Sequence, residues 1–578
     1  MCRFYNKMTF AGYITPDMVT FLLARERAKV VATNRRIAGT GGRDEALMAS
    51  QLKGLLPPRG AWVRPRKKDR DLHDRRWCVT HGITAAVKKA REAENRDPRD
   101  DEYLKRLDAF IARIRERAES EHVTFASPQT VALFKKEKRG NDGVKVIYRP
   151  ISVFTDLEDK ILIALASRFL MLIFNSSLHE EILSYRPARI YHGSRRRVIT
   201  DQSNAVENAI AFRNGHPGKD IYVAECDIQK FYDIINHDAV VRAFDTLAEE
   251  NDIGGYRSVR PVLLAYLDAY CFADNVAAEN GNPQFWSSAR SRYRHGKYAH
   301  NPNVRFCFEW VSREAFTDPQ HGCYSSEEFG SVMHRLGVPQ GGALSPVISD
   351  VVMNMVDRPV IEVDDPERFF NRYGDDILLM HTDRDRCHGL IEAYRSSLRR
   401  HGFIYHPFED FGGYKKGAGT RRCYWDAKSK DAFLWGPGEG QAAEWIGFVG
   451  YELHRNGAVR LRRSTLDKKF SAINSTYHKL LHAGPLETEA EREEYRKKVE
   501  QRLSHLTDSV GRCSLLNLNC YAAAQMGSLD RYRNRKIYKL RECVQKMRFG
   551  PLVGNVFGKM AGREYSYATR YSQVSGHA

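Results

Sequence analysis

The chain has 578 residues, with 91 Lys and Arg against 72 Asp and Glu, and so carries a formal net charge of +19. Hydrophobic residues make up 42%, which is ordinary for a globular protein and excludes disorder for most of the chain. The positive surplus points to a polyanionic partner, either nucleic acid or an anionic membrane. The most apolar window, residues 161–174, contains Arg168 and is shorter than the roughly 20 residues of a spanning helix. We therefore expect no membrane partner.

The first ten residues, MCRFYNKMTF, lack the apolar stretch and the small-residue cleavage site of a secretory signal. We therefore expect a cytoplasmic protein. Its 11 cysteines agree with a reducing compartment, because they are scattered, odd in number and include no CxxC pair. Most of them are expected to be buried thiols that act as small hydrophobic side chains.

Residues 1–124 are basic and weakly patterned, and we interpret them as an N-terminal extension, mostly helical. The run at 59–76 mixes many Lys and Arg with a few Asp, and Trp62 and Trp77 stand near its ends. Such a run suits either a solvated surface or a nucleic-acid contact. At 101–120, apolar residues recur at helical spacing with charges between them, which predicts an amphipathic helix.

Beyond residue 125, short apolar runs alternate with helical stretches, and a charged helical tail is predicted from 464 onward. Residues 275–330 are rich in Asn, Ser, Gly, Tyr and His and have no clear period, so we interpret them as a long insertion. The other expected elements are a hairpin at 134–153 turning at 140–143, a buried helix at 156–174, a strand at 221–228, a helix at 236–249, a Gly-rich turn into a helix at 337–355, a hairpin at 369–380, and tail helices at 487–506 and 526–547.

The segment 222–238, YVAECDIQKFYDIINHD, places an acid at the end of an apolar strand. Side chains alternate along a strand, so Glu225 and Asp227 are expected to face the side opposite Ala224 and Cys226. An unpaired buried carboxylate is costly, and Asp227 therefore needs a partner. Two interpretations stay open: a helix cap or salt bridge, and a metal ligand.

The segment 372–380, RYGDDILLM, places Asp375 and Asp376 at a tight turn between apolar strands. Gly-Asp is ordinary turn chemistry, so the turn alone is weak evidence for a site. Two adjacent acids repel each other, however, and a divalent cation would relieve that repulsion.

The segment 336–346, LGVPQGGALSP, is a Gly-rich loop expected to enter a helix. Gly341 and its neighbour let the backbone approach a ligand closely, and Gln340 offers both a donor and an acceptor. The loop could therefore hold a base pair or a sugar-phosphate, while the simpler interpretation is a flexible turn.

Together and in this order, an acid on a strand, a PQGxxxSP loop and a YGDD turn resemble the palm domain of reverse transcriptases, from about residue 125 to 545. The resemblance implies an α+β fold of the right-hand polymerase type, with antiparallel sheet backed by helices and an α-helical thumb. The implied domains are the basic extension 1–124, fingers 125–220, palm 221–455 with the insertion at 275–330, and thumb with C-terminal tail 456–578.

The same resemblance implies a two-metal site with Mg²⁺, or Mn²⁺ as an alternative. Asp227 and Asp375 match the two bridging acids, Asp376 matches a weaker third ligand, and the backbone carbonyl of Ile228 matches a further one. Two such ions can clamp the attacking and leaving oxygens of a phosphoryl transfer. One would activate the primer 3′-hydroxyl, and the other would hold the triphosphate and the departing pyrophosphate.

The resemblance also implies nucleotide-binding residues. Arg149 matches the arginine that holds the incoming triphosphate, and Lys136 or a neighbouring lysine joins it. Gln340 and Gly341 match the loop beside the nucleotide. Residues 184–187, SYRP, partly match a template-side motif but lack its Gly-Phe.

Two further segments follow the palm pattern. Residues 445–451, WIGFVGY, resemble the primer grip through Phe448, Gly450 and Tyr451. The segment 402–409, GFIYHPFE, places Glu409 where the family usually has a lysine, and no general acid is assigned.

A viral RNA-dependent RNA polymerase is the nearest alternative, since it shares the GDD turn. RNA polymerases place an Asp five positions after the first acid, where this chain has Tyr232, preceded by Phe231, and we expect both residues to belong to the nucleotide-binding site. A bulky ring there would clash with a ribose 2′-hydroxyl and select deoxynucleotides. We therefore expect DNA synthesis from dNTPs.

The resemblance points toward bacterial group II intron and retron-like enzymes, and among them the defence-associated "unknown group" and abortive-infection type. This rests on the N-terminal extension, the insertion and the lack of a recognisable RNase H, protease or endonuclease region. It implies antiviral defence with a partner noncoding RNA as template, an RNA/DNA duplex as product, and an oligomer or accessory protein. The alternatives are an intron-like maturase acting mainly by RNA binding, and a template-independent nucleotidyltransferase on the same palm.

Overall fold

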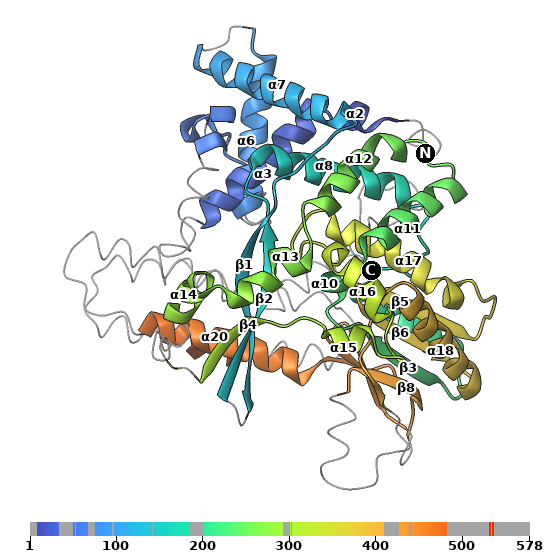
Figure 1. The fold of residues 1–578 in the computed structure, drawn as a ribbon. Coiled ribbons are helices and arrows are strands. Elements are labelled where there is room, and N and C mark those ends of the chain that lie inside the picture. The colour runs from blue at the N-terminus through green and yellow to red at the C-terminus, as the bar shows by residue number, and fades with distance from the viewer. Residues whose placement is uncertain are drawn as a thin grey trace. The chain divides into compact units, whose positions relative to one another are not determined.

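The computed structural model describes the helices, strands and loops that account for most of the first 480 residues (Figure 1). The predicted tail helices at 487–506 and 526–547 fall almost entirely outside them. The described residues are 8–33, 50–52, 54–66, 75–94, 98–140, 143–184, 186, 202–292, 301, 303–409, 427–437, 442–481, 531–532 and 535–536.

The chain is a mixed α+β protein that divides into two compact units, each built from separate stretches of sequence. Unit 1 comprises Met1–Ile199, Cys226–Asp365 and Gly389–Pro407. Unit 2 comprises Thr200–Glu225, Pro366–His388 and Phe408–Ala578. The predicted domains are continuous stretches of sequence, whereas each of these units is made of three separate stretches that alternate along the chain.

Helices dominate unit 1, and polar caps begin several of them. The predicted buried helix is α8, which begins after Asp156, whose side chain accepts a hydrogen bond from the Asp159 backbone N–H. Asn236 caps α11 in the same way. The helices are α2 (Phe10–Tyr13), α3 (Pro16–Thr33), η1 (Arg59–Ala61), α6 (Arg75–Glu92), α7 (Pro98–Glu119), α8 (Leu157–Phe174), α10 (Phe231–Ile234), α11 (His237–Glu250), α12 (Tyr256–Asp268), α13 (Phe272–Asn275), η2 (Ala277–Gly281), α14 (Pro283–Arg292), α15 (Arg313–Phe316), α16 (Ser326–Val332), η4 (Met333–Arg335) and α17 (Ser345–Ile361).

The predicted hairpin is present in unit 1 as β1 (Gln129–Gly140) and β2 (Gly143–Val153). The two strands pair antiparallel, with a register shift between Phe134 and Lys136. A third strand, β4 (Val304–Phe308), pairs parallel to β2 on its other side, so the sheet order is β1-β2-β4 (Figure 1).

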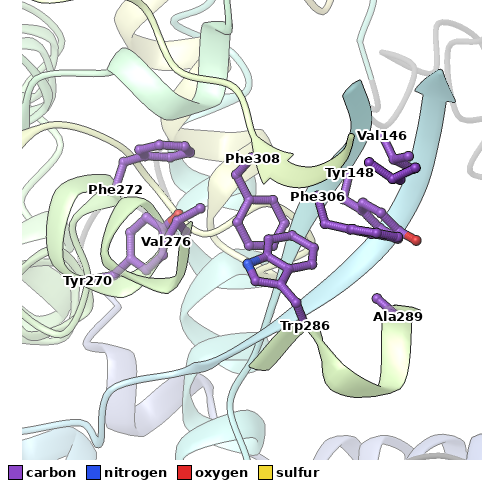
Figure 2. Close-up of a cluster of buried hydrophobic side chains, with 10 residues drawn as sticks. Val146, Tyr148, Tyr270, Phe272, Val276, Trp286, Ala289, Phe306 and Phe308 are labelled. Carbon is purple, nitrogen blue, oxygen red and sulfur yellow. The ribbon is translucent and has the colours of Figure 1, made fainter. Parts of the chain in front are cut away.

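The insertion is more ordered than its sequence suggests. It contributes β4 and several short helices, from η2 to α16. These elements are too short to establish a period, which explains why the pattern reads as irregular. Their order comes from packing instead: the aromatic rings of Trp286 and Phe306 lie against Tyr148 of the hairpin, and Phe308 packs on Trp286 (Figure 2).

Unit 2 is built on a five-stranded sheet with the order β5-β6-β3-β8-β7. The predicted strand is β3, and the predicted hairpin is β5 and β6, which pair antiparallel. The last two residues of β3, Cys226 and Asp227, are assigned to unit 1. The strands are β3 (Tyr222–Asp227), β5 (Arg368–Tyr373), β6 (Asp376–His381), β7 (Phe408–Glu409) and β8 (Ser429–Leu434).

The faces of β3 do not separate polar from apolar residues as the alternation suggested. Val223, Ala224, Glu225 and Cys226 are all buried. The Glu225 carboxylate is neutralised by Lys430 on β8, whose Nζ lies 2.7 Å from Oε2. This ion pair is why a strand with an acid can be buried on both sides.

A second, smaller sheet in unit 2 has the order β11-β10-β9. Its strands are β9 (Trp445–Phe448), β10 (Tyr451–His454) and β11 (Val459–Leu461). The predicted helical tail begins with α20 (Arg463–Leu481), and α9 (Gln202–Gly215) packs on β5. A further helix, α18 (Arg384–Arg400), contributes residues to both units. Among the described residues, no helix combines the length and apolar composition needed to cross a membrane.

Candidate active site

Asp227 ends β3, and a short segment near residue 405 fixes its backbone. The carbonyl oxygen of Asp227 accepts a 2.9 Å hydrogen bond from the backbone N–H of His406. Ile228 is buried and pairs with Tyr405 as an isolated bridge. The Asp227 side chain is 20% exposed, and its Oδ2 lies 3.9 Å from Nε2 of His406. A partly exposed carboxylate on a fixed backbone suits a metal ligand.

The turn after β3 has an unusual backbone. Lys230 has φ 52°, in the left-handed region that non-glycine residues seldom adopt, and it precedes α10. Within α10, Phe231 is buried and its ring stacks on Phe403 at 5.6 Å between centroids. Tyr232 is half-buried, and its carbonyl accepts a 2.8 Å hydrogen bond from the Val338 N–H. Phe231 is thus a core residue, whereas Tyr232 keeps part of its surface accessible.

Asp233, which the sequence did not single out, is the most deeply buried acid of this region, with 1% of its surface exposed. Its Oδ1 accepts a 2.5 Å hydrogen bond from Nε2 of Gln340. Burial raises the pKa of Asp233 to about 7, against the opposing effects of the Gln340 hydrogen bond and the nearby Lys230 ammonium. Only the structure could find this residue, because its partner is distant in sequence.

The Gln340 loop is held between the hairpin and α10. The carbonyl oxygen of Gln340 accepts a 2.9 Å hydrogen bond from the backbone N–H of Ser152 on β2. Gly341 has φ 92°, and a Cβ on Gly342 would lie 1.9 Å from the Tyr266 hydroxyl oxygen. Neither glycine can be replaced without strain, so the loop is a fixed element rather than a flexible turn.

Arg149 and Lys136 both lie exposed on the hairpin. Arg149 is opposite Leu133 in the register, and Lys136 is opposite Ile147. Arg149 lies near enough to Asp233 to oppose the rise of its pKa. Unit 1 therefore brings the hairpin, the Gln340 loop and the turn after β3 into one neighbourhood.

In unit 2, Asp375 and Asp376 occupy the predicted turn between β5 and β6. Gly374 has φ 68°, and Tyr373 pairs with Asp376 across the turn. Asp375 is half-buried and Asp376 is exposed. The fully buried Arg372 donates a 3.1 Å hydrogen bond from Nη1 to the Gly374 carbonyl, which stabilises the turn from inside.

The three predicted acids are therefore described in two units: Asp227 in unit 1, and Asp375 with Asp376 in unit 2. Their convergence on one metal site stays a prediction. The donor set fits a hard divalent cation, because all three are accessible carboxylates and Mg²⁺ prefers oxygen ligands.

The predicted primer-grip residues form the β9–β10 hairpin of unit 2. Phe448 and Tyr451 are buried and pair with each other, and Gly450 turns the chain with φ 88°. The carbonyl of Gly450 accepts a 3.1 Å hydrogen bond from the backbone N–H of Arg462. A rigid hairpin is present there, and its contact with a primer stays a prediction.

Two other motif residues have a structural role. Arg186 is 4% exposed and donates to the carbonyls of Asn175 at 2.7 Å and Ile182 at 2.8 Å. It therefore supplies hydrogen-bond donors to backbone carbonyls of the segment after α8. Ser184 donates a 2.7 Å hydrogen bond to Asp350. In the 402–409 segment, Glu409 lies on β7.

Cys271, Asp274 and His334 form a small cluster that sequence spacing did not indicate, because His334 is distant from the other two. Ordinary contacts account for it. The Cys271 sulfur caps α13 by accepting from the Asp274 N–H, and Nδ1 of His334 lies 3.0 Å from the Asp274 carboxylate. Burial raises the pKa of Cys271 to about 11, which disfavours the thiolate that a metal would need.

Comparison with known families bears directly on this geometry. Residues 302–407 match the family model described as "Reverse transcriptase (RNA-dependent DNA polymerase)". The match supports an RNA-directed DNA polymerase. The matched part of this polymerase includes the Gln340 loop and the Asp375–Asp376 turn, and it begins after Asp227 and Arg149. Enzymes of this class use divalent metal ions, in agreement with the carboxylate donors.

Solved telomerase structures are similar to the polymerase chain at low identity. One from Candida tropicalis, in complex with a TWJ fragment of telomeric RNA, is 11% identical, with TM-score 0.33, covering 86% of this chain and 75% of that one. Apo telomerase from the same organism is 12% identical, with TM-score 0.31, covering 92% of this chain and 87% of that one. Telomerase from Candida albicans, in complex with a TWJ fragment of telomeric RNA, is 14% identical, with TM-score 0.30, covering 89% of this chain and 76% of that one. TM-scores of this size do not establish a common fold. None of the curated proteins compared matches the chain.

Proposed function

We propose that the chain copies RNA into DNA from dNTPs by two-metal phosphoryl transfer on a right-hand polymerase fold. In this proposal residues 125–220 are the fingers, 221–455 the palm and 456–578 the thumb with its tail. The order of the elements along the chain supports it: a basic hairpin is followed by a strand that ends in an acid, the Gln340 loop, the Asp375–Asp376 turn and a basic helix.

The observation that carries the proposal is the position of Gln340. Its carbonyl accepts from Ser152 on the hairpin, and its amide donates to Asp233 beside Tyr232. A residue held at both ends between these two elements is preorganised to contact a ligand that lies between them. The basic residues of the hairpin, Arg149 and Lys136, favour a ligand with phosphate groups.

Two Mg²⁺ ions would be held by Asp227, the Ile228 carbonyl, Asp375 and Asp376. When bound, such ions stabilise the negative charge that develops on the attacking and leaving oxygens. The protein's own contribution is to fix the carboxylates: β3 and the His406 N–H hold Asp227, and buried Arg372 supports the turn that bears Asp375.

Tyr232 would select deoxyribose over ribose in the incoming nucleotide. Its half-buried ring is backed by Phe231, with centroids 5.0 Å apart, and Phe231 stacks on Phe403. A ring supported in this way cannot yield easily to a ribose 2′-hydroxyl, so deoxynucleotides are favoured.

For the biological role we propose cytoplasmic anti-phage defence with a noncoding RNA as template. The net charge of +19 suits an RNA/DNA duplex, because Lys and Arg neutralise phosphates without reading sequence. The interpretation of residues 1–124 and 275–330 as additions to a minimal polymerase supports this role over intron mobility.

The deciding experiment is cDNA synthesis by the purified chain and by Asp375→Ala/Asp376→Ala, with sequencing of the nucleic acid that copurifies with each. Loss of the acids should reduce synthesis by about a thousandfold or more and remove copurifying DNA while leaving bound RNA. Lys428→Met, an exposed change elsewhere in unit 2, is the control. Equal DNA yield from wild type and the double variant would refute the polymerase assignment, and extension by single dNTPs without RNA would favour the template-independent alternative.

A further inference from the structure

The insertion reaches the predicted nucleotide site through one strand. β4 pairs with β2 over five residues, from Val144 with Val304 to Tyr148 with Phe308. At its start, the backbone N–H of Val144 donates a 2.8 Å hydrogen bond to the Asn303 carbonyl. The chain therefore leaves β4 beside the same hairpin that bears Arg149 and Lys136.

An aromatic cluster anchors the end of β4. Phe308 packs on Trp286 with ring centroids 4.9 Å apart, and Tyr148 lies 5.4 Å from the same indole (Figure 2). The Asn280 side chain holds the backbone of Phe308 at both groups, accepting from its N–H at 2.7 Å and donating to its carbonyl at 3.0 Å. The residues that follow Phe308 are thereby fixed in place.

Glu309, the first residue after β4, meets three lysines, two on the β1–β2 hairpin and one in the turn after β3. Its carboxylate lies 3.0 Å from Nζ of Lys138 on β1, 3.4 Å from Lys145 on β2 and 3.7 Å from Lys230 in the turn after β3. Its side chain is only 16% exposed. Burial alone would raise the pKa of Glu309, but the three ammonium groups outweigh it and lower the pKa.

The next residue adds a second link to the same turn. Nε1 of Trp310 donates a 3.0 Å hydrogen bond to the carbonyl oxygen of Asp233, and the indole stacks on Phe272 at 5.0 Å. Lys230 itself keeps a left-handed backbone, φ 52°, which only a well-packed surrounding can maintain. Glu309 therefore joins the hairpin to the turn after β3, and Trp310 adds a contact with Asp233 in α10, which follows that turn.

We propose that Glu309 is a positioning residue for the incoming nucleotide, which ties the β1–β2 hairpin to the Lys230 turn and so holds the triphosphate-binding face in its nucleotide-ready arrangement. This inference rests on the proposed polymerase function. An exposed ion pair alone contributes little, but three cations that converge on one largely buried carboxylate form a network across elements. Without Glu309 the lysines would repel one another, and the hairpin would have to be ordered by the nucleotide itself at a cost in affinity.

The test uses Glu309→Gln in the full chain, with Glu309→Asp as the conservative variant and Glu137→Gln as the matched control. Glu137 lies on the same hairpin and pairs with Arg139 of β1 at 2.9 Å, so its replacement makes the same charge change at a different place on the hairpin. Hydrogen exchange without substrate measures how well the hairpin is ordered, and steady-state kinetics measure the KM for dNTP and kcat.

For Glu309→Gln we expect faster exchange across residues 129–153 and a KM for dNTP raised about tenfold, with kcat within about twofold of wild type. Glu309→Asp should recover part of both effects, and Glu137→Gln should behave as wild type. Unchanged exchange in Glu309→Gln would refute the tether. Faster exchange with unchanged KM would refute the nucleotide-positioning role. If wild type synthesises no DNA, the proposed function fails, and exchange alone still decides the tether.

Discussion

Two parts of the candidate site are built in different ways. Gln340 contacts segments far from it in sequence: its amide donates to Asp233, 107 residues away, and its carbonyl accepts from Ser152 on the β1–β2 hairpin. The Asp375–Asp376 turn is local, because Gly374 supplies its conformation and Arg372, two residues earlier, supports it. The nucleotide side is therefore as stable as the tertiary packing of unit 1, whereas the acid turn depends mainly on its own hairpin.

The strongest test of this contrast is the buried ion pair between Glu225 on β3 and Lys430 on β8, within the unit 2 sheet. Lys430→Met should leave the Glu225 carboxylate buried without its cation and lower the free energy of unfolding by about 3–5 kcal/mol. The side chains are only 6% and 11% exposed. Urea denaturation measures the change, with Lys428→Met, which is exposed, as the control. If both variants lose the same stability, unit 2 depends on local structure alone.

Asp233 offers the next largest effect, and it depends on pH. Its pKa of about 7 in the folded protein lies above the usual 3.8. The carboxyl therefore contributes stability at low pH that is lost as pH rises from about 4 through 7. Asp233→Asn removes this dependence, so its stability relative to wild type should increase across that window, by at most roughly 4 kcal/mol.

Melting curves at pH 5, 6, 7 and 8 measure the Asp233 effect. The exposed Asp268 gives a matched control, Asp268→Asn. A constant difference between Asp233→Asn and wild type across the range would mean that the Gln340 contact, and not burial, determines the state of Asp233.

The smallest of the three effects concerns the selection of dNTP over rNTP. Tyr232→Val should increase ribonucleotide incorporation by roughly 10- to 100-fold, because removing one steric contact changes selectivity by an amount of this order. Tyr232→Phe keeps the ring and should keep the discrimination. Incorporation ratios from competing dNTP and rNTP measure it. Unchanged selectivity in Tyr232→Val would remove the steric-gate assignment and leave Tyr232 as a packing residue.

The elements were predictable where local pattern determines them. The β1–β2 hairpin, the helix after Asp156 and the turn at Gly374 follow from turn residues, a cap and periodicity. The elements of the insertion were not predictable, because short elements such as β4 show no sequence period and are ordered by aromatic packing. Within the candidate site, the sequence motifs predict Asp227, Asp375 and Asp376 as metal ligands, and that assignment stays a prediction.

Asp233, Lys230 and Glu309 were missed for a common reason. Each draws its significance from a partner on another element: Gln340 for Asp233, and Glu309 for Lys230. No local pattern reports such pairs. The strand β3 illustrates the same limit, since the alternation rule could not anticipate that Lys430 would permit Glu225 to be buried.

The parallel pairing of β4 with β2 also constrains the order in which the chain can fold. Antiparallel β1 and β2 close through a tight turn, but β4 follows only after the whole stretch that contains β3 and α10 to α14. Parallel pairing over so long a separation is slow to form. During synthesis, the free edge of β2 therefore stays without its partner until the ribosome has passed Phe308, and the hairpin matures late although it is encoded early.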